Sequence, residues 1–157
     1  IYGYKEETNK FPTDEDLKTA FANSVLSNQH AKETLFTIAL YQINTVLNDV
    51  TALSSNSFSV EHMMPKKWEQ NWAKTLTSEQ KNFRNQKLLT LGNLTIITKN
   101  LNSTLRNSAW SNKKKILQDN SAIPLTTKYT SEPDWNEEKI ASRANDLYDM
   151  AVLIWKK

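Results

Sequence analysis

The 157-residue chain has no cysteine, and it has only two histidines and two glycines. Without cysteine it cannot form disulfides, zinc ribbons or thiol nucleophiles, so any bound metal must use oxygen or nitrogen ligands. No apolar run approaches the ~20 residues that a membrane span needs, and the N-terminus does not resemble a signal peptide. We therefore expect a cytoplasmic protein that does not contact a membrane. Because the chain starts at Ile1 rather than at a methionine, we also expect it to be part of a longer protein.

Positive charge is concentrated in the middle of the sequence. Residues 61–115 contain eleven basic and three acidic residues, a net charge of +8, whereas the remainder has nine basic and fourteen acidic residues, a net charge of −5. Such a basic segment is typical of proteins that bind polyanions, because lysine and arginine displace the counterions of phosphate groups. The charge alone favours a nucleic acid only slightly over a lysine-rich face exposed to water.

The hydrophobic spacing predicts an α+β fold that is mostly helical. Thr13 precedes a first turn rich in acids, and Thr77 or Ser78 is placed to start a later helix. Asp134 and Glu137 predict a capping box for the last helix. The sequence predicts helices over 13–26, 29–48, 76–89, 107–120 and 134–157, and strands over 58–63 and 91–98.

One of the two histidines, His62, lies in the stretch 59–65, which reads SVEHMMP. It follows the carboxylate of Glu61 directly, and it precedes two methionines, which we expect in the core, and Pro65, which ends the strand. A lone histidine is more often structural than catalytic, and His30 has no comparable neighbours. The acid and the proline make His62 the stronger candidate for chemistry.

The wider pattern around His62 resembles that of the HNH (His-Me finger) nucleases. It is more closely similar to the C-terminal nuclease domain of GmrSD-type (type IV, modification-dependent) restriction enzymes. An acid–histidine pair and a proline are followed by a Leu-Gly-Asn-Leu-Thr segment, by a second asparagine nine residues after the first, and by a lysine-bearing helix. The residues that carry the resemblance are Glu61, His62, Pro65, 91–95, Asn102, Asn107 and Lys114, with Trp135, Ile140, Arg143, Leu147, Ala151 and Trp155 near the C-terminus.

The resemblance implies a ββα-metal motif embedded among helices, in one compact domain. Residues 1–56 would form an N-terminal helical part, 57–120 the nuclease core, and 121–157 a helix that packs on the core. The implied activity is metal-dependent nicking or cleavage of DNA in a restriction or phage-defence enzyme of the prokaryotic cytoplasm. The implied partners are DNA and a ParB-like nucleotide-hydrolysing domain in the N-terminal part of the full-length protein. A homodimer would bring two sites together for a double-strand break.

The chemistry of phosphodiester hydrolysis accounts for these residue types. A neutral imidazole can deprotonate water near neutral pH, so His62 is the candidate general base. Mg²⁺ or Mn²⁺ would offset charge on the phosphate, and Glu61 and Asn102 are the candidate ligands because hard cations prefer oxygen. Neighbours on a strand point to opposite faces, so Glu61 and His62 can serve one site only at a bend or a strand end.

By the resemblance, Asn93 fixes the loop that carries the histidine through hydrogen bonds to its backbone, so we count Asn93 and Asn102 with His62 among the catalytic residues. The candidate contacts with the DNA backbone are the basic and polar residues around the motif. These are Lys66, Lys67, Lys99, Arg106, Asn107, Lys113, Lys114 and Lys115.

Two other classes of function stay open. A nucleic-acid-binding module with a degenerate nuclease site would keep the basic surface, but it would not need the acid, the base and the distal asparagine together. A helical interaction domain would explain the terminal helices but not the basic centre. We expect Trp68, Trp72 and Trp110 to pack in the core, where they replace the zinc-binding cysteines that brace many relatives in the wider class.

Overall fold

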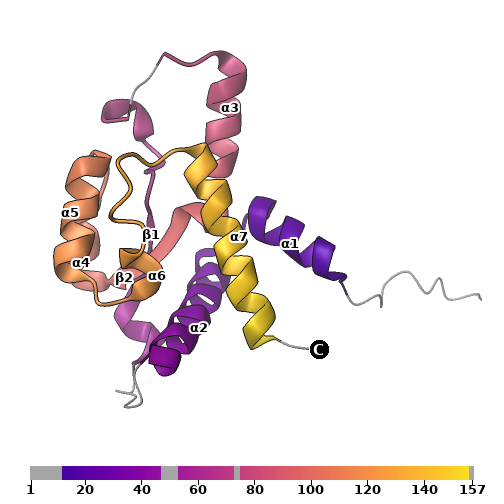
Figure 1. The fold of residues 1–157 in the computed structure, drawn as a ribbon. Coiled ribbons are helices and arrows are strands. Elements are labelled where there is room, and N and C mark those ends of the chain that lie inside the picture. The colour runs from indigo at the N-terminus through magenta and orange to yellow at the C-terminus, as the bar shows by residue number, and fades with distance from the viewer. Residues whose placement is uncertain (1–11, 47–52, 73–74, 156–157) are drawn as a thin grey trace, which may run out of the picture.

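The computed structural model describes residues 12–46, 53–72 and 75–155, and in these ranges helices surround one small two-stranded β-sheet (Figure 1). The expected α+β fold is confirmed. The α-helices are α1 (Asp14–Asn23), α2 (Asn28–Val46), α3 (Ser78–Lys87), α4 (Lys99–Leu105), α5 (Trp110–Asn120), α6 (Pro124–Thr127) and α7 (Glu137–Ile154). The strands are β1 (Phe58–His62) and β2 (Leu94–Thr98), and the 3₁₀ turns are η2 (Ser55–Ser57), η3 (Trp68–Gln70) and η4 (Leu91–Asn93).

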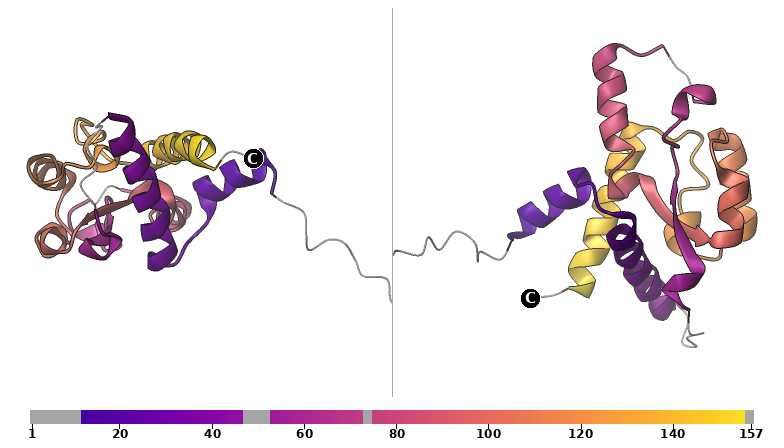
Figure 2. Two further views of the ribbon diagram at one scale, coloured as in Figure 1. Left: turned by 90° about the horizontal axis from the view of Figure 1, so that it is seen from below. Right: turned by 180° about the vertical axis from the view of Figure 1, so that it is seen from behind.

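The two strands pair antiparallel, with Phe58 opposite Thr98 and His62 opposite Leu94. Their side chains alternate between two helical layers. Val60 and Ile96 pack into the core cluster that includes α2 and α7, whereas Ile97 packs against α4 and α5. The views in Figures 1 and 2 show the two-stranded sheet between the α4–α5 pair and α7. The sheet therefore has a helix-covered face on each side, and its ends are the places where polar side chains can reach solvent.

Local capping explains where two of the helices begin. The Thr13 side chain accepts a hydrogen bond from the Asp16 backbone, and Thr77 does the same for the Gln80 backbone, each within a complete capping box. The predicted last helix is present, but the predicted capping box of Asp134 and Glu137 was wrong, because the N-cap is Asn136, which accepts from Lys139 N–H at 3.0 Å. Two short helices, α4 and α6, were not predicted as separate elements.

A second core cluster lies beside the start of the α7 helix and is rich in aromatic residues. Trp68, Trp110 and Trp135 are buried in it, and Met63 and Met64 are completely buried. The rings of Trp110 and Trp135 lie 5.4 Å apart. The expectation that these methionines, Trp68 and Trp110 serve as core residues is therefore confirmed. Trp72 lies half-buried against the same cluster.

Helix α7 packs directly on the η4 turn that leads into β2. A Cβ atom on Gly92 would lie 2.1 Å from the carbonyl oxygen of Ile140, so only glycine allows this approach. The buried guanidinium of Arg143 donates to the carbonyls of Leu91, Gly92 and Leu94 at 3.2, 3.0 and 2.6 Å. The C-terminal helix thus holds the backbone on both sides of Asn93. Among the described residues, no helix is long and apolar enough to cross a membrane.

Candidate nuclease site

His62 is the last residue of β1, and its ring is half-buried. Consecutive side chains leave a strand on opposite faces, and Glu61 lies on the face that α4 and α5 cover. The condition under which both could serve one site is met, because β1 ends at His62 and the next residues turn away toward the buried Pro65. The strand end therefore presents a carboxylate and an imidazole from adjacent positions.

The backbone that follows His62 is held by Asn93. The Met63 N–H donates to the Asn93 carbonyl at 2.9 Å, and the Met64 N–H donates to Asn93 Oδ1 at 2.8 Å. In return, Asn93 Nδ2 donates to the Met64 carbonyl at 2.8 Å. These are the side-chain to backbone hydrogen bonds that the sequence analysis expected of Asn93. Their effect on catalysis by His62 stays a prediction.

Asn93 is itself fixed from two other directions. Its Nδ2 also donates to the Leu88 carbonyl at 2.8 Å, and Trp135 Nε1 donates to its Oδ1 at 3.0 Å. The Asn93 side chain is fully buried, so each of the four hydrogen bonds made by this side chain forms away from water. A buried amide with all its groups paired tolerates little movement. Through Trp135, the segment before α7 contributes to the position of the strand end.

Glu61 forms a buried ion pair with Lys113 of α5. Lys113 Nζ lies 2.5 Å from Glu61 Oε1, and it also donates to the His62 carbonyl at 2.7 Å. Burial raises the pKa of Glu61, and the nearby ammonium of Lys113 opposes that rise. Lys113 has no exposed surface, so the sequence prediction that it binds DNA is wrong for this structure. Instead, Lys113 contacts the side chain of Glu61 and the backbone carbonyl of His62.

The electrostatics of the site keep His62 uncharged near neutral pH. Burial, together with the positive charges of Lys66 and Lys113, lowers the pKa of His62 to about 4. A neutral imidazole is the form that accepts a proton. A bound phosphate would oppose this lowering, because a nearby anion favours the imidazolium.

The candidate metal ligands are Glu61 at the end of β1 and Asn102 in α4. Among the described residues, Glu61 Oε2 receives no hydrogen bond, so one carboxylate oxygen is left for a cation while Oε1 binds Lys113. Asn102 lies in α4, which contacts both strands, but its side chain is outside the described part of the structure. No group of three or more acidic, histidine or cysteine side chains in the described ranges could hold a metal. A carboxylate oxygen with an amide oxygen still fits Mg²⁺, which keeps several of its waters.

The remaining DNA-binding candidates differ in exposure. Lys66, Lys67, Lys99 and Arg106 are exposed, and Lys66 lies close enough to His62 to affect its pKa. The other candidates are partly engaged with protein groups: Asn107 with Gln70, Lys114 with the Glu132 carbonyl, and the exposed Lys115 with Asp119.

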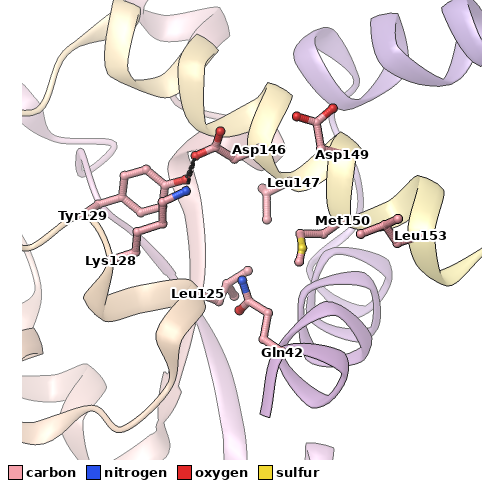
Figure 3. Close-up of a pocket in the computed structure, with 9 residues that line it drawn as sticks. All are labelled: Gln42, Leu125, Lys128, Tyr129, Asp146, Leu147, Asp149, Met150 and Leu153. Carbon is pink, nitrogen blue, oxygen red and sulfur yellow. Dashed lines mark hydrogen bonds and ion pairs between the residues drawn. The ribbon is translucent and has the colours of Figure 1, made fainter. Parts of the chain in front are cut away.

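A pocket between α2, α6 and α7 lies apart from the strand end (Figure 3). Three of its polar side chains pair with one another: Lys128 donates to Asp146 at 2.8 Å, and Tyr129 also donates to Asp146. Burial and the Asp146 hydrogen bond raise the pKa of Tyr129 well above its usual range. A tyrosine held in its protonated form is a poor base.

Two contacts that build the site were not predicted from the sequence: the ion pair of Lys113 and the hydrogen bond from Trp135 to Asn93. The helical spacing of α5 could have indicated the burial of Lys113. Lys113 lies three residues after Trp110 and four before Leu117, so it shares the buried face of α5 with both. The second contact joins residues 42 positions apart, and no local pattern indicates it.

The family model described as "GmrSD restriction endonucleases, C-terminal domain" matches residues 11–150. No curated protein and no solved structure matches the chain significantly. The matched range includes the strand end, the η4 turn and most of α7, so it covers each part of the site described above.

Proposed function

This chain belongs to the family of C-terminal domains of GmrSD restriction endonucleases, and we propose that it hydrolyses DNA phosphodiester bonds at an HNH-type site built around His62. The observation that supports this proposal best is the set of hydrogen bonds that fix the backbone at the end of β1. Asn93 and Lys113 together bind the backbone from the His62 carbonyl to the Met64 carbonyl. Fixed placement of a reacting group is worth several kcal/mol of barrier in general, and these hydrogen bonds fix the backbone that directly follows His62.

In the proposed reaction, His62 takes a proton from the attacking water. Its imidazole is neutral near pH 7 because its pKa is lowered, so no prior deprotonation is needed. The approach of a phosphate raises its proton affinity and so improves it as a base. Asn93 acts through the backbone of the loop and does not touch the substrate.

Glu61 Oε2 and the side chain of Asn102 would hold Mg²⁺ or Mn²⁺. When bound, this cation would supply Lewis-acid stabilisation of the charge that develops on the phosphate and on the departing 3′ oxygen. Lys113 holds Oε1 of Glu61, which leaves the other oxygen as the one that can face a cation. Glu61 therefore would bind the metal through one oxygen only.

The exposed basic residues would contact backbone phosphates of the DNA. Lys66 and Lys67 follow the histidine loop, and Lys99 and Arg106 lie at the two ends of α4. Contacts of this kind position a duplex without reading its sequence. We therefore assign the choice of target to another part of the enzyme.

In the full-length protein, that part would be an N-terminal ParB-like nucleotide-hydrolysing domain that senses modified DNA. The whole enzyme would act in the cytoplasm, as a restriction system against phage. One site of this kind cuts one strand, so two copies of the chain would be needed for a concerted double-strand break.

Supercoiled plasmid DNA tests the activity directly. The chain should convert it to nicked or linear forms with Mg²⁺ or Mn²⁺, and EDTA should stop the conversion. His62→Ala should lose the activity, while His30→Ala, at the exposed start of α2, should retain it. DNA binding without metal-dependent cleavage would instead support a non-catalytic binding module.

A further inference from the structure

The ion pair between Glu61 and Lys113 joins the end of β1 to the first turns of α5. Lys113 is fully buried and Glu61 is only 7% exposed, so water reaches neither charge freely. A buried ammonium is stable only beside a counter-ion and hydrogen-bond acceptors. Lys113 has both, at Glu61 Oε1 and at the His62 carbonyl.

In the described part of the chain, Lys113 is the cation that balances Glu61. Its position is fixed by the packing of α5, since Trp110 and Leu117 are buried on the same helical face. The ammonium cannot swing out to solvent without unpacking that face. Lys113 therefore stays beside the carboxylate whether or not another cation arrives.

A divalent cation on Glu61 Oε2 would share this carboxylate with the ammonium. Positive charges a few ångströms apart repel each other strongly at a site with little water. The same ammonium orients the carboxylate through the Oε1 hydrogen bond. Its two effects are thus opposed: it positions the metal ligand, and it weakens the binding of the metal.

We propose that Lys113 is the resident counter-ion of Glu61 and competes with free divalent cations for its charge, so that the domain binds its metal weakly until a DNA phosphate adds negative charge. This inference rests on the proposed function, in which Glu61 is a metal ligand. In this proposal, Lys113 is a positioning residue that also lowers the affinity of the site for the divalent cation.

The test measures how Mn²⁺ changes the melting temperature without DNA, at one fixed pH. Lys113→Gln keeps hydrogen-bond donors near Glu61 but removes the charge, and Lys113→Met removes both. In either variant, a saturating concentration of Mn²⁺ should raise the melting temperature by about 5 °C or more, against less than about 2 °C for the parent chain. Calorimetric titration should show Mn²⁺ affinity at least about tenfold tighter than in the parent.

Lys115→Gln is the matched control, because it makes the same charge change two residues along α5 on an exposed side chain. Its response to Mn²⁺ should equal that of the parent. The double variant Glu61→Gln with Lys113→Gln should lose the Mn²⁺ response, which places the cation at Glu61. If the Lys113 variants do not fold alone, the addition of Mn²⁺ should restore their far-ultraviolet circular dichroism.

An unchanged or weaker Mn²⁺ response in the Lys113 variants would overturn the counter-ion role, as would variants that stay unfolded with Mn²⁺. This outcome is distinct from failure of the proposed function. A parent chain that cleaves plasmid while the variants show no added Mn²⁺ response contradicts the counter-ion role alone. A parent chain that never cleaves, with variants that bind Mn²⁺ tightly, contradicts the nuclease alone.

Discussion

Replacing Asn93 by alanine should destabilise the domain more than any change on its surface. The substitution leaves four buried backbone and side-chain groups without partners: the Met64 N–H and carbonyl, the Leu88 carbonyl and the Trp135 N–H. At about 1 kcal/mol or more for each buried group left unpaired, we expect a loss of about 4 kcal/mol or more in the free energy of unfolding. A domain has only about 5–15 kcal/mol to lose.

Asn93→Asp separates geometry from hydrogen bonding. The shape is kept, and one oxygen still accepts from Met64 N–H and Trp135 Nε1, but the other oxygen replaces the amide that donates to two carbonyls. Near pH 7 we expect a loss of about 2–4 kcal/mol, since two carbonyls then face an acceptor. The plasmid cleavage rate should fall as well, because the loop after His62 loses its clamp.

Urea unfolding at pH 7 measures both changes through the transition midpoint. Asn120→Ala is the control, because this exposed asparagine makes one hydrogen bond, to the Ile116 carbonyl, and its loss should stay within about 0.5 kcal/mol. If Asn93→Ala unfolds as easily as this control does, the buried network does not fix the strand end and the argument for the site loses its main support.

Three further predictions concern acid sensitivity, packing and DNA binding. The pKa of His62 is lowered to about 4 in the folded chain, so between pH 6.5 and pH 4 the unfolded chain binds a proton at His62 more readily than the folded chain does. The free energy of unfolding therefore falls as the pH falls from about 6.5 toward 4. The loss is at most about 3 kcal/mol, and it is smaller because the ring is only half-buried. Urea unfolding of His62→Gln should show a smaller loss across that range; an equal loss refutes the assignment. Gly92→Ala should lower the melting temperature by about 5 °C or more, because its Cβ would meet the Ile140 carbonyl, and an unchanged value contradicts that contact. Lys66→Ser and Lys67→Ser should each reduce the slope of log affinity against log salt by about 1, and a constant slope excludes phosphate contact.

The elements of the fold were predictable where the signal is local. The capping threonines Thr13 and Thr77 specify helix starts through bonds to their own first turns, so the sequence alone indicates them. The start of α7 was predicted wrongly for the opposite reason. Glu137 has the spacing of a capping box with Asp134, but it forms an ion pair with the buried Arg84 instead. A bond across 53 residues outweighs the local pattern.

The candidate site was predictable in its residue types and less so in its contacts. Asn93 stands where its hydrogen bonds to the histidine loop were expected, since a buried amide can satisfy both a donor and an acceptor of a loop. Counting charges along the sequence does not show that Lys113 and Arg143 are buried. Both are cations on buried helical faces, and both bind backbone carbonyls instead of solvent. Burial of a charge depends on acceptors from distant segments, which a linear sequence does not display.

The most direct test of the proposed chemistry is the single-turnover rate of DNA cleavage by His62→Ala, with Mg²⁺, measured with and without added imidazole. If His62 is the general base, its removal should slow cleavage by about 100-fold or more, and free imidazole should restore part of the rate by filling the space of the lost ring. Cleavage by His62→Ala at the rate of the parent chain would contradict the account.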